Sequence, residues 1–108
     1  MKDRDWRRWQ LACEMDSRAK GFHRAVERIG AVREGRYFGT VPDLKQTVLR
    51  ARRRWAEFRR AAARYAAVGG DLGGSTFTLY HLANAYRLWT QLRLPRLMKR
   101  AVLGVRHD

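Results

Sequence analysis

A chain of 108 residues is long enough to bury a hydrophobic core without disulfides or a structural metal, and we expect one domain over residues 1–108. Its formal charge of +14 favours polyanionic partners: DNA, RNA, an anionic membrane or an acidic protein surface. The single cysteine, Cys13, excludes an internal disulfide, and the absence of a run of about 18 apolar residues argues against a membrane-spanning helix.

The first predicted element is helical and covers about residues 4–34. Its apolar residues recur at steps of three and four, as one face of an α-helix requires: Ala12, Met15, Ala19, Phe22, Val26 and Ile29. Gly21 weakens this pattern, and Asp16 with Ser17 could cap a second helix. One long helix and two helices broken near 16–21 both fit the segment.

A loop is predicted over 35–41, and we expect its aromatic residues, Tyr37 and Phe38, to fold back onto the helices. The second predicted helix covers 42–68, where Pro42 suits the first turn and Asp43 suits the positive end of the helix. Apolar residues again recur at steps of four and three: Leu44, Val48, Ala51, Trp55, Phe58, Ala62 and Tyr65.

The glycine-rich stretch GGDLGGST, residues 69–76, resembles part of a phosphate-binding loop in its letters. Such a loop needs a lysine after its last glycine and a strand before its first, whereas Ser75 follows Gly74 and a helix precedes Gly69. A turn between two helices explains the same residues: Gly69 and Gly70 end one helix, and Ser75 or Thr76 caps the next.

The third predicted helix covers 76–94 and is the most apolar element, so we expect it at the centre of the core. Its main apolar stripe is Leu79, Leu82, Tyr86 and Trp89, widened by Phe77, Leu88 and Leu92. Pro95 should end it, and a short basic helix over 96–103 follows. The fold class is therefore all-α, a compact bundle of three to four helices with a long basic amphipathic helix at its middle. The helical stripes also permit a homodimer.

Few residues offer catalytic chemistry. His23 and Glu27 are four residues apart on one helical face, but two ligands do not make a metal site, and a surface ion pair explains them better. His81 borders the apolar stripe of the third helix and is expected to be a partly buried packing residue. We therefore expect neither an enzyme nor a bound cofactor or metal.

The strongest functional signal is the second helix. From Lys45 to Arg64 it carries eight basic residues and one acid, Glu57, whereas solvated helix faces normally mix signs because like charges four residues apart repel. A second basic and aromatic element stands near the N-terminus. The candidate binding residues are Lys45, Arg50, Arg52, Arg53, Arg54, Arg59, Arg60, Arg64, Arg96, Lys99, Arg100, Arg7, Arg8 and Trp6.

Two hypotheses follow from this charge pattern. The first is a small protein that binds DNA or RNA through phosphate contacts, without sequence preference. The alternative is an inhibitor or adaptor of the phage or mobile-element type, whose Arg face docks on an acidic surface of a nucleic-acid-handling protein. Membrane-surface binding is less favoured, because Trp55 and Phe58 are needed in a core. The segment MKDRDWRRWQ lacks the apolar stretch of a signal peptide, so a cytoplasmic location is expected.

Overall fold

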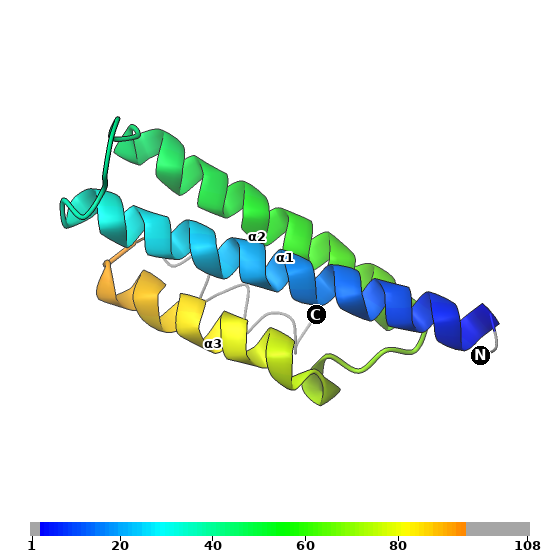
Figure 1. Cartoon of the computed structure of the whole chain (residues 1–108). Helices are drawn as coiled ribbons and strands as arrows, with labels where there is room; N and C mark the ends of the chain where they lie inside the picture. Colours follow the sequence, from blue (N-terminus) through cyan, green and yellow to red (C-terminus); the bar gives the residue numbers. More distant parts are fainter. Residues whose placement is uncertain (1–2, 95–108) are drawn as a thin grey trace.

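The computed structural model describes residues 3–94, which form three α-helices and a short 3-10 turn, with no strand among them. Their bounds are α1 Asp3–Arg33, α2 Leu44–Ala67, η1 Leu72–Gly74 and α3 Thr76–Gln91. Consecutive helices run in opposite directions, and α1 lies between α2 and α3 (Figure 1). The all-α prediction is confirmed, while the predicted helix over 96–103 lies outside the described residues. None of these three helices is long and apolar enough to cross a membrane.

Helix α1 is continuous, which decides between the two interpretations of its sequence. Its 31 residues rise about 1.5 Å each and so run along the longest dimension of the molecule, 49 Å. Gly21 and Gly30 lie inside the helix, and Gly30 is buried. Asp16 caps no second helix; its carboxylate instead accepts a hydrogen bond from Ser75 Oγ at 2.8 Å.

The core is built around α1, not around α3 as its apolar sequence suggested. Met15, Phe22, Val26 and Ile29 of α1 are fully buried. The ring centroid of Phe22 lies 5.1 Å from that of Trp55 in α2 and 6.3 Å from that of Trp89 in α3. One aromatic side chain thus contacts both outer helices, and burial of these apolar surfaces supplies most of the driving force for packing.

Helix α2 buries Ala51, Trp55 and Phe58 of the predicted stripe, and the stripe residues Val48, Ala62 and Tyr65 are partly buried against the same core. Leu44 is exposed, and Thr47 is buried in its place. The reason lies at the N-terminus of the helix, where Asp43 is the N-cap: its carboxylate accepts from the amide of Lys45 at 3.1 Å. The carbonyl of Asp43 also accepts from the Thr47 hydroxyl at 2.8 Å, which satisfies that hydroxyl inside the bundle.

The glycine-rich stretch is a turn, as its sequence predicted. Gly69 has φ +81°, and the amides of Gly69 and Gly70 donate to the carbonyls of Ala66 and Tyr65 at 3.0 and 2.9 Å. This pattern is a Schellman motif, which needs a left-handed residue directly after the helix. Ser75 is the N-cap of α3 and accepts from the amide of Thr78 at 3.3 Å.

Helix α3 buries Leu82 and Trp89 of the predicted stripe, but its first turns face the core differently from the prediction. Phe77 and Leu79 are exposed, whereas Thr78 and His81 are buried together with Leu82, Ala85 and Trp89. Thr78 donates its hydroxyl to Asp16 of α1, so this polar contact fixes the rotation of the helix. The helix ends at Gln91, three residues before the predicted end.

The connector between α1 and α2 holds its two aromatic residues differently. Tyr37 is half-buried against the helices, as expected. Phe38 is 96 % exposed, so the expectation that it folds back onto the bundle is wrong. Gly35 and Gly39, on either side, have φ angles of +69° and +83°. Glycine adopts these left-handed conformations readily, and between the two glycines the connector carries Phe38 away from the helices.

Candidate functional site

Five of the basic residues predicted on α2 extend into solvent with no hydrogen bond or ion pair from their side chains to any described residue: Lys45, Arg50, Arg53, Arg59 and Arg60. We call this set the α2 basic face. Arg53 and Arg60 are two helical turns apart, about 10 Å along the axis. None of these five side chains has an ion-pair partner within residues 3–94, whereas the charges of a solvated helix surface are usually mixed in sign.

The remaining basic residues predicted on α2 have structural roles or are partly covered. Arg54 pairs with Glu57 at 3.0 Å, and Arg64 pairs with Glu14 of α1. Arg52 is half-buried, and its Nε is buried without a partner among the described residues. The pair with Glu14 joins α2 to α1 and so removes one predicted binding residue from the free surface.

The predicted binding residues near the N-terminus also differ in their contacts. Arg8 is half-buried and its Nε donates to the carbonyl of Val68 at 3.3 Å, tying α1 to the end of α2. Trp6 stacks on Trp9 with ring centroids 5.0 Å apart, and both rings are about half exposed. Arg7 is exposed. The last three predicted binding residues lie outside the described residues: Arg96, Lys99 and Arg100.

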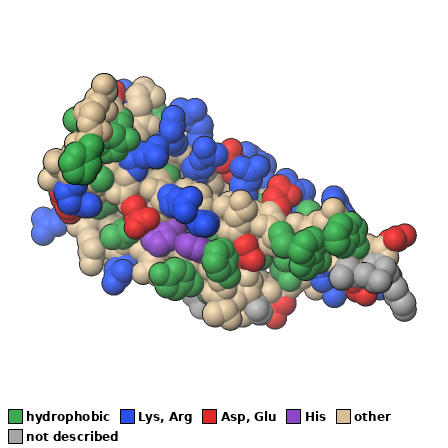
Figure 2. Space-filling model, viewed as in Figure 1, with side chains coloured by type: hydrophobic (Ala, Val, Ile, Leu, Met, Phe, Trp, Pro, Cys, Tyr) green, Lys and Arg blue, Asp and Glu red, His purple; other side chains and the backbone are tan. Residues whose placement is uncertain are grey.

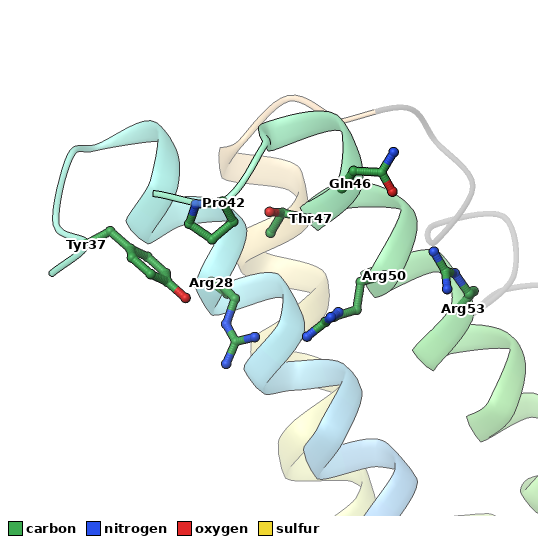
Figure 3. Close-up of a pocket in the computed structure, with 7 residues that line it drawn as sticks. All are labelled: Arg28, Tyr37, Pro42, Gln46, Thr47, Arg50 and Arg53. Carbon is green, nitrogen blue, oxygen red and sulfur yellow. The ribbon is translucent and has the colours of Figure 1, made fainter. Parts of the chain in front are cut away.

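A cavity of about 250 Å³ lies where the connector meets the two long helices. It is lined by Arg28, Tyr37, Pro42, Gln46, Thr47, Arg50 and Arg53 (Figure 3). Arg50 extends from α2 toward α1, where Arg28 lies, the Tyr37 hydroxyl points toward Arg28, and Arg53 lies farther along α2 (Figure 3). We call this space the arginine cavity.

The lining of the arginine cavity contains three arginines and no acidic side chain. Arg28, Arg50 and Arg53 have no side-chain hydrogen bond or ion pair within residues 3–94. Each guanidinium offers several N–H donors in a planar fork, which matches the oxygens of a phosphate or carboxylate. The cavity can therefore bind an anion.

Arg28 was missing from the residues predicted from the sequence, and its position explains why. It belongs to α1, whereas the conspicuous charge run is in α2. Only the antiparallel packing of the two helices brings Arg28 beside Arg50. The space-filling view shows Lys and Arg side chains gathered over α1 and α2, with acidic side chains between some of them (Figure 2).

Comparisons with protein-family models, curated proteins and solved structures give no match.

His23 and His81 form a contact that the sequence did not reveal (purple in Figure 2). Their Nδ1 atoms lie 2.8 Å apart, so the ion pair expected between His23 and Glu27 is replaced by a bond from α1 to α3. Burial lowers the pKa of His81 from its ordinary 6.5, and the nearby charge of His23 lowers it further. Among residues 3–94 no group of three or more His, Cys, Asp or Glu could hold a metal ion.

Proposed function

We propose that this chain is a non-enzymatic nucleic-acid-binding protein that contacts the phosphate backbone through the α2 basic face. One observation carries the proposal: α2 bears five unpaired cations, and two of them, Arg50 and Arg53, line a cavity together with the unpaired Arg28 of α1. Like charges on such a surface repel one another, and a bound polyanion offsets this repulsion.

The chemistry of the face suits phosphate better than base edges. Arginine donates charge-assisted, bidentate hydrogen bonds to phosphate oxygens. Such contacts position a nucleic acid without reading its sequence, because the backbone is the same at every nucleotide. Binding should therefore tolerate any sequence and weaken steeply as salt rises, since each neutralised phosphate releases counterions.

Charge reversal on the outer ridge of α2 tests the proposal. The variant carries Arg53→Glu and Arg60→Glu, and the matched control carries Arg4→Glu and Arg87→Glu, exposed residues of α1 and α3. Both variants change the net charge equally. We expect the α2 variant to lose much more affinity for DNA and RNA than the control does, with the helical circular dichroism signal of both unchanged. Equal losses in the two variants would count against the α2 basic face as the site.

A second candidate function, docking on an acidic protein surface, is favoured by exposed apolar side chains. Phe77, Leu79 and Tyr80 project from α3 into solvent, and Trp6 and Trp9 do so from α1. Aromatic and arginine side chains together are typical of the energetic centres of protein interfaces. The two functions differ in salt dependence: a protein complex held partly by apolar contacts survives moderate salt, whereas phosphate binding does not.

A further inference from the structure

The end of the bundle where α1 turns into α2 combines an exposed aromatic ring with unpaired arginines. Phe38 is the most exposed of the large hydrophobic residues in the described chain, at 96 %. Scattered apolar residues on a surface are common. Phe38 differs because it lines a shallow hollow together with three arginines, Arg24, Arg28 and Arg36, and one acid, Glu27.

This Phe38 hollow adjoins the arginine cavity. Arg28 and Tyr37 line both spaces, so the two spaces are neighbours. Arg36 is held by Glu34, with Nε and Oε2 2.7 Å apart, and Arg28 is free of any partner in the described chain. A ligand that spans the two spaces would meet guanidinium groups in the cavity and a flat apolar ring beside them.

We propose that this end of the bundle is a nucleotide subsite for single-stranded nucleic acid. One phosphate occupies the arginine cavity, and a neighbouring unpaired base stacks on Phe38. The inference rests on the proposed function, because it names the form of nucleic acid that the α2 basic face accepts. It assigns roles to Arg28 and Phe38, neither of which belongs to the basic run of α2.

The aromatic ring is what selects a single strand. Phosphates are available on single strands and duplexes alike, so the arginine cavity by itself discriminates little. In a duplex, bases are paired and stacked on one another, and a phenyl ring on the protein surface reaches them only at an end. In a single strand every base has a free face, and aromatic stacking holds it without regard to sequence.

The test compares binding of oligothymidylate, oligouridylate and a DNA duplex of equal length to the full chain at about 100 mM salt, where the Debye length is about 10 Å. The variants are Phe38→Ala and, as a control, Phe77→Ala, which removes a phenyl ring of α3 that is 49 % exposed and packs edge-on against His81. Neither ring belongs to the buried core. Thermal melts of both variants verify that the bundle is intact.

We expect the unmodified chain to prefer the single strands. Phe38→Ala should weaken single-strand binding about fivefold or more, as loss of one stacked base does, and change duplex binding less than twofold. Phe77→Ala should behave like the unmodified chain. The two oligonucleotides distinguish DNA from RNA as the source of the base.

A second variant tests the cavity. Arg28→Gln removes a guanidinium that lies outside α2 and should weaken binding to all three probes, whereas Arg87→Gln on α3 should not.

Failure of the subsite and failure of the proposed function give different results. Binding that survives Phe38→Ala unchanged, or falls equally on single strands and duplex, would overturn the subsite and leave the proposed function standing. No binding of the unmodified chain to any probe would overturn both.

Discussion

The Nδ1 atom of His23 in α1 lies 2.8 Å from the Nδ1 atom of His81 in α3. One of the two nitrogens must carry a hydrogen and donate it, and the other must accept the hydrogen bond. This hydrogen bond can form as long as at least one ring is neutral. His81 is almost buried, and its ring packs edge-on against Phe77, with ring centroids 4.6 Å apart. A charge on both rings would place like charges in contact between two helices.

Stability should therefore depend on pH through His81. Burial lowers its pKa, as do the charges of His23, Lys20 and Arg24, while Asp16 raises it. Between this lowered pKa and the ordinary value of 6.5, the unfolded chain binds more protons than the folded one. The free energy of unfolding thus falls as pH drops through 6.5 toward the folded pKa, by at most about 1.4 kcal/mol per pH unit. Well above 6.5 the ring is neutral in both states, and this group contributes no pH dependence.

Urea unfolding at about pH 8 and about pH 5 measures this effect. His81→Gln has no proton to bind at residue 81, so its stability should fall less between the two conditions than that of the unmodified chain. The carboxylates titrate in both proteins, so the difference isolates the histidine. An equal loss of stability in the variant and the unmodified chain would mean that protonation of His81 does not destabilise the folded state.

Asp16 should be important for stability because it anchors the start of α3. Its carboxylate accepts from Ser75 and from the fully buried Thr78 hydroxyl. Asp16→Ala would leave that buried hydroxyl without its acceptor on α1, at a cost of about 1–3 kcal/mol. Asp16→Asn keeps an acceptor oxygen and should cost less. Chemical denaturation checks both, with Glu27→Ala, at an exposed position of α1, as the control.

Two glycines should respond oppositely to alanine. Gly69 has φ +81°, where a side chain is strained, so Gly69→Ala should destabilise the fold by about 1–2 kcal/mol. Gly21 lies inside α1 with nothing within 4 Å of an added Cβ, so Gly21→Ala should stabilise it by about 0.5–1 kcal/mol. Thermal melting of the two variants gives the signs directly. A Gly69→Ala variant as stable as the unmodified chain would contradict the left-handed end of α2, and a destabilised Gly21→Ala variant would contradict the open space beside Gly21.

The sequence predicted where the three helices of the described chain lie, because each leaves a local signal, but it did not decide whether α1 is continuous. The spacing from Met15 to Ile29 predicts a helical face, and Gly69 predicts where α2 ends. The rotation of α3 could not be predicted in this way. It depends on Thr78 meeting Asp16, two polar residues 62 positions apart, and a hydrophobic pattern carries no information about such a contact.

The candidate site was likewise predictable where its signal is local and not where it depends on tertiary packing. The α2 basic face was visible as a run of charge, since the helical period places Arg53 and Arg60 on one ridge. The pairing of Arg64, another basic residue of α2, was not visible, because its acid is Glu14 of another helix. Arg28 and the exposure of Phe38 likewise follow only from tertiary packing and the path of the connector.

The central claim is that unpaired arginines on α2 bind phosphates, and a salt series of nucleic-acid binding tests it most directly. Fluorescence anisotropy on labelled DNA should give a logarithm of affinity that falls linearly with the logarithm of salt concentration. The slope should be about −0.7 on single strands, or about −0.9 on duplex, per phosphate neutralised. Replacement of Arg53 and Arg60 by glutamate should make the slope shallower by about 2. Affinity that is absent at about 100 mM salt, or that does not change with salt, would contradict the claim.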